Sequence, residues 1–260
     1  MTNESEQYPP KISIITPSLN QGAYIEQNIK SIIDQKCPWV EHIILDGGSS
    51  DETLSILKRY ENQIIWRSEK DSGQVYALNN GLKMATGDII TFLNSDDYYL
   101  PGSLIHISEL FKNAEIQWVT GDCVVVNSKN EQIHKSISLF KSLLRRLKIR
   151  QIHLLFNCFI QPSTFWRRSL QMEAGYFDKQ FDYAFDYDYW IRLYKISQPY
   201  ITEKKLSAFR IHPQSKGSMS FIKQFDEEIS ILKKNHANIF IIFLHKILNL
   251  LIKIIYKYIK

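Results

Sequence analysis

The residues best able to do chemistry form a polar group that directly follows a short apolar run. Residues 85–101 read Ala-Thr-Gly-Asp-Ile-Ile-Thr-Phe-Leu-Asn-Ser-Asp-Asp-Tyr-Tyr-Leu-Pro, and Ile89 to Leu93 predicts a buried strand. Asp96 and Asp97 are adjacent, and neighbouring carboxylates at the end of a core strand are costly unless a positive group neutralises them. A divalent cation that also holds a phosphate is the partner indicated, because Mg²⁺ or Mn²⁺ takes one or two carboxylates and leaves positions for phosphate oxygens. The alternative is an ordinary strand-to-turn junction, where Asn, Ser and Asp are favoured.

The length and composition predict a globular α/β protein with an uneven charge. The 260 residues suffice for one sizeable domain or two small ones, and 44% of them are hydrophobic. The net charge is +5, but residues 141–150 carry five basic side chains and no acidic one, and the last 30 residues carry six lysines and no acid. Such patches indicate an anionic partner: phosphate, a membrane surface or nucleic acid.

The cysteines and the N-terminus indicate a reducing compartment. Cys37, Cys123 and Cys158 are few and widely spaced, so they predict neither a disulfide framework nor a metal site. Residues 1–10 are polar and lack the apolar core of a signal peptide, and we expect them to form a flexible leader.

The first hundred residues alternate between strand and helix patterns, which predicts a parallel, doubly wound, Rossmann-like sheet. Ser49 and Glu52 have the spacing of a capping box at the start of the second helix. The expected order is strand 11–16, helix 24–35, strand 42–45, a second helix through Leu54, Leu57 and Tyr60, strand 64–66, a third helix ending at Met84, and strand 89–93.

Polar residues follow each predicted strand, and in such sheets ligands bind beyond the carboxyl ends of the strands. These residues are Thr16 and Ser18, Asp46, Asp71, and Asp96 with Asp97. No Gly-x-Gly-x-x-Gly follows the first strand and no Gly-x-x-x-x-Gly-Lys-Ser/Thr occurs, so a dinucleotide oxidoreductase or a P-loop enzyme is disfavoured.

The second half continues with a helix at 102–113 and a hairpin of strands 118–126 and 132–134. Residues 137–150 predict a basic amphipathic helix. Its apolar face consists of Phe140, Leu143, Leu144 and Leu147, and Lys141, Arg145, Arg146 and Lys148 lie elsewhere. A helix rich in aromatic and acidic residues begins within 182–193.

In their order and spacing, these pieces resemble the family 2 glycosyltransferases, which are inverting enzymes of the GT-A fold. The resemblance covers roughly residues 11 to 218. It implies an α/β GT-A domain at 11–220, with a nucleotide-binding half at 11–100 and an acceptor half at 101–220, followed by a basic amphipathic helical tail at 221–260. The matching segments are 14–20, 45–53, 69–74, 79–81, 85–88, 93–97, 161–165, 186–193 and 209–212.

The resemblance implies a donor site for a nucleotide sugar, most simply a UDP-sugar. Asp46 would accept a hydrogen bond from the uracil or thymine imide, Thr16 and Ser18 would line the base and ribose pocket, and Asp71 would lie near the ribose and sugar. The further donor-binding residues implied are Asn20, Asn79, Asp96 and Arg210.

The resemblance also implies a Mn²⁺ or Mg²⁺ ion on the family's Asp-x-Asp motif. Asp96 and Asp97 match the motif, but its first position is the uncharged Asn94. Which of the two carboxylates binds the ion directly is therefore open. His212 is implied as a further metal ligand, and Arg210 and His212 would reach the diphosphate or the metal.

A carboxylate is implied as the general base that deprotonates the acceptor hydroxyl. The family pattern carries Glu-Asp before an Asp-x-Trp-x-Arg segment; here Phe185 replaces the Glu and Asp186 aligns with the base. Asp188 points elsewhere on a helix, and Arg192 is expected to pair with a carboxylate of the same helix. The alternative is that both acids merely begin a helix, where the dipole favours them.

The C-terminal tail predicts a helix that lies on a membrane surface. Lys246, Asn249, Lys253, Lys257 and Lys260 fall within roughly an 80° arc of an otherwise Ile/Leu-rich helix. Three lysines within the run argue against a spanning helix, and an interfacial helix fits better. The alternative is packing on the domain or on another subunit. The basic helix at 137–150 would add attraction to anionic lipid.

We therefore expect an inverting, metal-dependent glycosyltransferase of glycan or polysaccharide assembly, with a saccharide acceptor that is lipid-linked and no nucleic-acid partner. Its expected location is cytoplasmic, peripheral on the inner face of the plasma membrane. One alternative is an inactive nucleotide-sugar-binding module, which Asn94 and Phe185 favour. The other is a sugar-phosphate nucleotidyltransferase, which is disfavoured because the first strand lacks that class's Gly-rich, Arg-containing loop.

Overall fold

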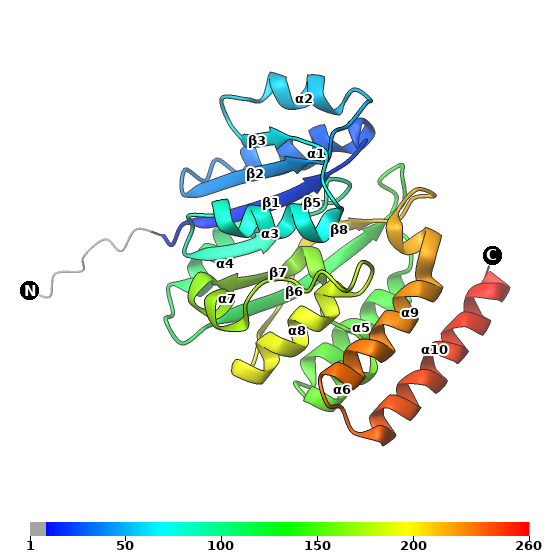
Figure 1. The fold of residues 1–260 in the computed structure, drawn as a ribbon. Helices are drawn as coiled ribbons and strands as arrows, with labels where there is room; N and C mark the ends of the chain where they lie inside the picture. The colour runs from blue at the N-terminus through cyan, green and yellow to red at the C-terminus, as the bar shows by residue number, and fades with distance from the viewer. Residues whose placement is uncertain (1–8, 260) are drawn as a thin grey trace, which may run out of the picture.

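The computed structural model describes residues 9 to 259, without the side chains of 217–221 and 253–259. Most of the leader expected at 1–10 therefore lies outside the described residues. The helices are α1 Gly22–Ile33, α2 Thr53–Arg59, α3 Gln74–Met84, α4 Ser103–Phe111, α5 Lys135–Arg146, α6 Arg150–Leu155, α7 Arg168–Ala174, α8 Phe185–Ile196, α9 Lys216–Lys234 and α10 Ile239–Ile259 (Figure 1). The strands are β1 Ile12–Ser18, β2 Val40–Asp46, β3 Ile65–Ser68, β4 Ile89–Phe92, β5 Tyr98–Tyr99, β6 Trp118–Val126, β7 Thr164–Arg167 and β8 Tyr200–Arg210.

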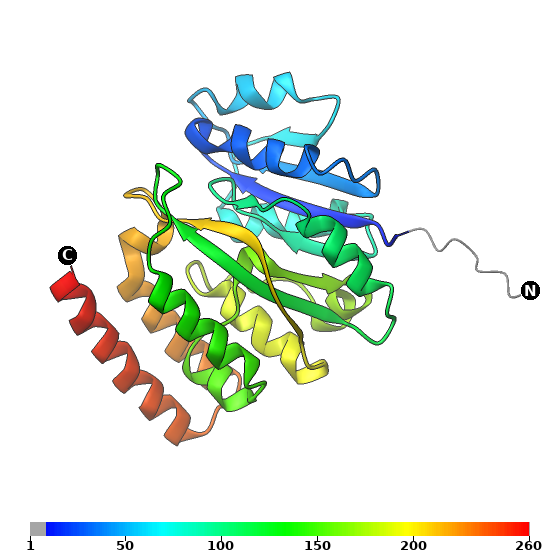
Figure 2. The ribbon, with the colours of Figure 1, turned by 180° about the vertical axis from the view of Figure 1, so that it is seen from behind.

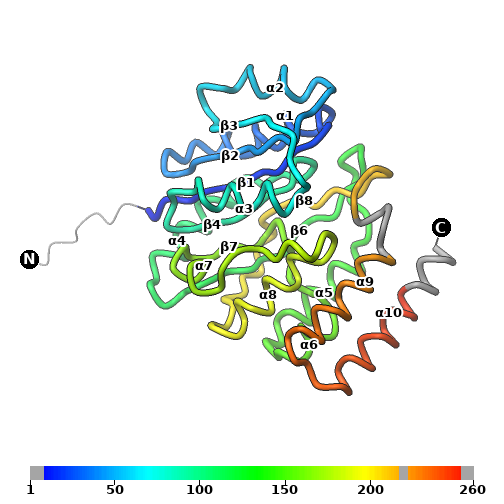
Figure 3. The backbone as a smooth tube through the Cα atoms, in the orientation of Figure 1, coloured from blue at the N-terminus to red at the C-terminus, as the bar shows by residue number. Residues whose placement is uncertain are grey.

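All eight of these strands form one sheet in the order β3-β2-β1-β4-β7-β6-β8-β5 (Figure 3). The first four strands run parallel, as the alternation of strand and helix patterns predicted. β7 is antiparallel to both neighbours, β4 and β6, whereas β6 and β8 are parallel. The prediction of a mostly parallel α/β sheet is confirmed, and its first half is doubly wound.

Apolar side chains cover both faces of the parallel half, which is why its strands are near-continuous apolar runs. Ile12 and Ile14 of β1 pack in one core with α4, whereas Ile15 faces the other core with α3 and α8. Gly81 lets α3 approach β1 closely, because a Cβ at Gly81 would lie 2.3 Å from Ile15 Cγ2. The two cores hold the sheet rigidly, so the strand ends are fixed in position.

Three local predictions were wrong. The capping box does not form, because α2 begins at Thr53 with no side-chain cap and the Ser49 hydroxyl donates to Asp46 instead. The second strand of the hairpin is reduced to an isolated bridge between Val126 and Gln132. The helix expected at 137–150 begins earlier and ends at Arg146, and a second helix, α6, follows it.

The C-terminal segment packs against the domain. α9 runs across the boundary expected at residue 220, and α10 packs on α6 and α9. His245 of α10 is buried, with Nε2 3.1 Å from Glu228 Oε2 of α9 and Nδ1 3.0 Å from the Leu154 carbonyl of α6. Of the helices that the structure describes, none has the length and apolar character needed to cross a bilayer.

Candidate functional site

The loops that follow β1 and β2 are tied together at the carboxyl edge of the sheet. The backbone N–H of Asn20 donates to the Ser49 hydroxyl at 2.7 Å, and the side-chain Oδ1 of Asn20 accepts from the Ser50 N–H at 2.8 Å. Asn20 itself has a φ of 53°, in the left-handed region that Asn tolerates. Asn20, which was predicted to bind the nucleotide sugar, therefore lies at this edge and holds the two loops together.

Asp46, at the end of β2, is buried within its own turn. Its Oδ2 accepts from the Gly48 and Ser49 N–H groups at 3.1 and 2.9 Å and from the Ser68 hydroxyl at 2.7 Å. Within the part of the chain that the structure describes, the only hydrogen bond to its Oδ1 comes from the Ser49 hydroxyl. A carboxylate oxygen can accept a second bond, so Oδ1 keeps an acceptor position for a ligand N–H.

Thr16 and Ser18 differ in their surroundings. Thr16 is fully buried, and its hydroxyl lies 2.9 Å from Nε2 of the buried His42, whose pKa burial lowers to about 3. Ser18 is nearly buried, and within the described part of the chain its hydroxyl has no hydrogen-bond partner. The Ser18 hydroxyl is therefore available to a ligand at the site, whereas the Thr16 hydroxyl links β1 to His42 of β2.

Asp71 lies against the turn that holds Asp46, and Asn79 lies apart from both. A Cβ at Gly47 would be 3.3 Å from Asp71 Oδ1, which also accepts from the Gly73 N–H at 2.8 Å. Asn79 is buried in α3. Its Nδ2 donates to the Phe177 carbonyl at 2.9 Å, and its Oδ1 accepts from the Phe177 N–H at 3.0 Å. The structure thus brings Asp71 to the site, whereas Asn79 ties α3 to the segment between α7 and α8.

Asn94, which replaces the first acid of the motif, belongs to a chain of neutral amides. Its Oδ1 accepts from Gln74 Nε2 at 2.8 Å, and its Nδ2 donates to Gln161 Oε1 at 3.0 Å. Gln161 Nε2 donates in turn to the Phe92 carbonyl at 2.6 Å. Lys216 of α9 donates to Gln74 Oε1 at 3.3 Å and to the Asp182 carbonyl. This chain connects the strand end at β4 with the loop that leads into α8.

Asp96 pairs with His212, which lies two residues after the end of β8. Asp96 Oδ2 lies 3.1 Å from His212 Nε2, and the His212 ring packs on Tyr24 with centroids 4.8 Å apart. The hydrogen bond with Asp96 raises the pKa of His212, against the lowering effect of burial. The two predicted metal ligands Asp96 and His212 therefore lie together, although they are 116 residues apart in sequence.

Asp97 turns away from Asp96 into the interior. Its Oδ1 accepts from the Arg210 N–H at 2.8 Å, and among the described residues its buried Oδ2 has no partner. Burial, together with the charge of Asp96, raises the pKa of Asp97 well above its ordinary value.

The buried side chain of Arg210 supports this turn through hydrogen bonds and ring contacts. It is 1% exposed, its Nε donates to the Asp96 carbonyl at 2.7 Å, and one terminal nitrogen donates to Gln27 Oε1 at 2.7 Å. Its guanidinium also lies over the Tyr24 and Tyr98 rings. Arg210 therefore holds the Asp96–Asp97 turn in place from behind.

The residues around Asp96 suit a hard divalent cation only in part. Asp96 and His212 offer one oxygen and one nitrogen donor, and Asp97 offers an unpartnered but buried oxygen. Among the described side chains, no group of three His, Cys, Asp or Glu residues is placed to hold a metal ion. An ion at Asp96 would therefore need further oxygens from a bound ligand, as is usual for Mg²⁺ at phosphate sites.

Asp186 lies in the first turn of α8. Burial raises its pKa to about 6, although it accepts from the Tyr187 N–H at 2.8 Å, and the charge of Glu228 on α9 adds to the rise. A carboxylate with a pKa near 6 is ionised at neutral pH and still takes up a proton readily, which is what a general base requires.

Glu227 of α9 fixes the approach to Asp186. Its carboxylate accepts from three consecutive N–H groups, those of Asp182 and Tyr183 at 2.9 and 2.8 Å and that of Ala184 at 2.8 Å. Ala184 is the N-cap of α8, so Glu227 satisfies donors that the helix start leaves without intrahelical partners.

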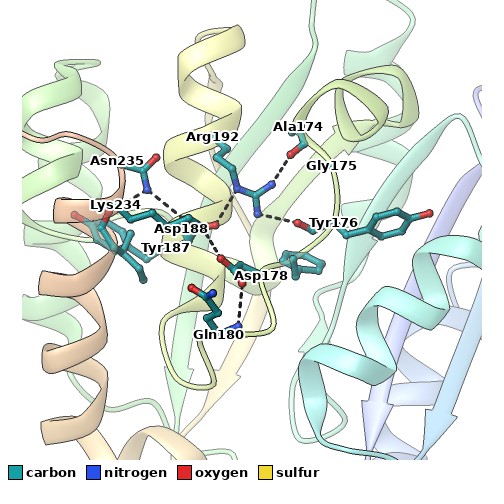
Figure 4. A network of polar contacts seen from close by, with 12 residues as sticks. Ala174, Gly175, Tyr176, Asp178, Gln180, Tyr187, Asp188, Arg192, Lys234 and Asn235 are labelled. Carbon is teal, nitrogen blue, oxygen red and sulfur yellow. Dashed lines mark hydrogen bonds and ion pairs between the residues drawn. The ribbon is translucent and has the colours of Figure 1, made fainter.

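Asp188, which its position two residues after Asp186 predicted to point elsewhere on the helix, takes part in a structural network. Figure 4 shows its carboxylate between Arg192 Nε at 2.9 Å and, on the other oxygen, Lys234 and Asn235 at 3.2 Å each. Arg192 also donates to the Tyr176 carbonyl at 2.9 Å. The expectation that Arg192 pairs with a carboxylate of its own helix is confirmed, and the network joins α8 to α9.

The sequence reasoning missed the residues that support the site from α9 and α3. Glu227 and Glu228 fell in the segment interpreted as the tail, and Lys216 lay at the end of the predicted domain without a role. Gln74 carried no recognisable signal beyond its place in a matched segment. Gln161 belonged to a matched segment but received no role. Only the fold shows that these side chains lie beside Asp186 and Asn94.

Comparison with known proteins agrees with this geometry. The model of the family described as "Glycosyl transferase family 2" matches residues 13–172. An uncharacterised glycosyltransferase of Rickettsia prowazekii is 27% identical over 207 residues, covering 79% of this chain and 65% of its own. The GalNAc(5)-diNAcBac-PP-undecaprenol beta-1,3-glucosyltransferase of Campylobacter jejuni is 30% identical over 209 residues, covering 78% of this chain and 64% of its own. The chain thus spans slightly less than two thirds of these relatives.

Solved structures share the fold. TarS of S. aureus in complex with UDP-GlcNAc superposes with a TM-score of 0.70 at 18% identity, covering 86% of this chain and 65% of that one. The mannosyltransferase PcManGT from Pyrobaculum calidifontis, in complex with GDP-Man and Mn²⁺, gives a TM-score of 0.67 at 18% identity, covering 88% and 64%. The predicted GT-A fold is confirmed, and the chain belongs to glycosyl transferase family 2.

Proposed function

We propose that this protein transfers a sugar from a nucleotide-sugar donor to a hydroxyl of a saccharide acceptor, with inversion at the anomeric carbon. The observation that supports the proposal is the arrangement at the carboxyl edge of the sheet. The Asp46 turn and the Asp96–His212 pair follow β2, β4 and β8, and the contacts from Asn94 through Gln74 and Lys216 link this edge to the loop that leads into α8 and Asp186. The family membership and the complexes of TarS with UDP-GlcNAc and of PcManGT with GDP-Man support it.

The donor would bind across the ends of β1, β2 and β4. Asp46 Oδ1, with its remaining acceptor position, would take the imide N–H of uracil, which favours a UDP-sugar over a cytidine-linked one. The free hydroxyl of Ser18 and the carboxylate of Asp71 would contact the ribose and the sugar. Asn20 would hold the loop that forms this pocket.

Asp186 would act as the general base. Its carboxylate accepts the proton of the acceptor hydroxyl while that oxygen attacks the anomeric carbon from the face opposite the diphosphate. The bond from the anomeric carbon to the diphosphate oxygen breaks, and the nucleoside diphosphate leaves with the electron pair. Glu227 would keep the start of α8 in position during this step.

Asp96 and His212 would hold a Mn²⁺ or Mg²⁺ ion that also binds the donor diphosphate. Asp97, the other carboxylate of the motif, is turned into the interior and would support the turn rather than bind the ion. When bound, the ion stabilises the charge that develops on the leaving diphosphate.

The acceptor is proposed to be lipid-linked, in cell-surface glycan or polysaccharide assembly at the cytoplasmic face of a membrane, with α10 lying on that membrane. The printed name of the Campylobacter relative describes a substrate carried on PP-undecaprenol, and a Bacillus subtilis relative, 40% identical over 102 residues, is named for teichuronic acid biosynthesis. An inactive donor-binding module is the second candidate, favoured by Asn94 and Phe185 in place of two acids of the family pattern.

A release assay tests the proposal. Purified protein is incubated with a panel of UDP-, GDP-, TDP- and CDP-sugars, each with Mn²⁺, Mg²⁺ or chelator, and free nucleoside diphosphate is measured. We expect release from a UDP-sugar in the presence of a divalent ion and little release with chelator. Tight binding of a donor without release under any condition would favour the inactive module instead.

A further inference from the structure

Helix α5 is oriented with its polar face inward and its apolar face outward. On the inner face, the Ser142 hydroxyl donates to Asp122 Oδ2 at 2.9 Å, and Arg145, which is 0% exposed, pairs with Asp122 and donates to the Cys158 carbonyl at 2.8 Å. On the outer face, four large apolar side chains are exposed: Leu139 at 62%, Phe140 at 51%, Leu143 at 54% and Leu147 at 54%.

This orientation is the reverse of an ordinary surface helix, which buries its apolar stripe against the core. Single exposed apolar residues are normal, but a contiguous row on one helix face marks a surface that is covered in use. The buried Arg145–Asp122 pair fixes the orientation, because turning the helix over would leave the Asp122 carboxylate without its partner.

The charges around the apolar row identify what covers it. Exposed basic side chains flank the row, and the segment from residue 135 to residue 150 contains no acid. Arg146 pairs with Glu203 at 2.9 Å and with Asp122 at 3.6 Å, and Lys141 donates to the Asn157 carbonyl at 3.5 Å. Lys135, Lys148 and Arg150 are exposed. An apolar stripe bordered by lysines and arginines is the signature of a helix that lies in the interface of an anionic bilayer. These flanking residues are Lys135, Lys141, Arg146, Lys148 and Arg150.

Helix α10 also exposes apolar side chains at the same end of the molecule. Phe243, Leu250 and Leu251 are exposed, whereas the inner side of α10 buries Ile242 together with the polar His245 and Asn249. Both helices pack on α6, and in Figures 1 and 2 α5, α6 and α10 lie together at the end farthest from α2. Each of these two helices, which both pack on α6, thus exposes large apolar side chains at this end of the molecule.

We propose that α5, together with α10, is a docking face for an anionic lipid bilayer, into which α5 inserts Leu139, Phe140, Leu143 and Leu147. Burial raises the pKa of Asp186, and the charge of Lys141 on α5 acts to lower it. A lipid-linked acceptor held in the bilayer would present its sugar beside α5; this consequence, unlike the docking itself, rests on the proposed function.

Vesicle flotation of the full chain tests the docking face. The probes are vesicles of phosphatidylcholine with phosphatidylglycerol, and vesicles of phosphatidylcholine alone. The test variant combines Leu139→Ser with Leu143→Ser, and the matched control combines Ile105→Ser with Met172→Ser, which are also exposed, at 47% and 75%, but lie on α4 and α7. All four side chains are exposed, so folding should be unaffected.

We expect the wild-type chain and the control to bind the anionic vesicles, less strongly in high salt. The Leu139/Leu143 variant should bind at least about tenfold more weakly, because it removes two side chains from the apolar row. Equal binding of variant and control would overturn the proposal. So would a wild-type dimer in solution that the variant converts to monomer, because the face would then be covered by a second copy.

Nucleotide release without acceptor, measured on the same three proteins, separates the two proposals. All three should release nucleoside diphosphate at the same rate, because neither double variant touches the donor site. If none of them releases it while flotation follows the expected pattern, the proposed function fails and the docking face stands.

Discussion

Replacing Asp186 by Asn is expected to lower the rate of sugar transfer by about a thousandfold, within the range that a positioned general base contributes. Asn keeps the size and the bond to the Tyr187 N–H but cannot accept a proton. Donor binding should change by less than about twofold, because Asp186 faces the acceptor. The measurement is transfer rate against donor affinity in the same preparation, with Asp182→Asn as the exposed, neighbouring carboxylate-to-amide control.

The same substitution should stabilise the fold at alkaline pH. The pKa of Asp186 rises from 3.8 to about 6 on folding, so the stability that its protonated form contributes is complete below pH 3.8 and is lost as the pH rises through about 6. The amide of the variant does not titrate and has no such loss, and the difference corresponds to at most about 3 kcal/mol at pH 8. A higher melting temperature of Asp186→Asn at pH 8 but not at low pH is the expected result; equal melting temperatures at pH 8 would show that Asp186 is not held in a desolvated site.

Asp96→Asn and Asp97→Asn should differ sharply in their response to metal. We expect Asp96→Asn to raise the Mn²⁺ concentration needed for half-maximal nucleotide release by about 100-fold or more, because even residues that only orient a ligand change metal affinity by about 10- to 100-fold. Asp97→Asn should shift it by less than about threefold, since Asn keeps the acceptor for the Arg210 N–H and resembles the protonated acid that burial favours.

A metal titration of both variants decides between the two carboxylates. Protein folding is monitored by circular dichroism, because Asp97 is buried and supports the turn. If the folded Asp97→Asn protein loses metal activation as completely as Asp96→Asn, then Asp97 is a direct ligand and the assignment of Asp96 and His212 as the main pair is wrong.

The parallel half of the fold was predictable because its signals are local. The apolar runs of β1, β2 and β4 and the helical spacing of Ile25, Ile29 and Ile32 each depend on a few neighbouring residues. The strand ends could then be placed at one edge by the rule for parallel sheets. This rule is enough to place Asp46 and Asp96 at that edge from the sequence alone.

The supporting residues were not predictable because their partners are distant in sequence. Glu227 meets the N–H groups of Asp182 to Ala184 across more than 40 residues, and a carboxylate on an amphipathic helix gives no sign of that contact. The orientation of α5 could not be predicted from the sequence for a related reason. Hydrophobic spacing shows that a helix has two faces but not which one points inward, and only the pairing of Arg145 with Asp122 decides it.

The most direct test of the account is a crystal structure of the protein with UDP and Mn²⁺. The account predicts the uracil imide against Asp46 Oδ1, the ion between the diphosphate, Asp96 and His212, and the Asp186 carboxylate open on the side where the sugar would lie. A nucleotide bound elsewhere, or an ion that contacts neither Asp96 nor His212, would contradict it.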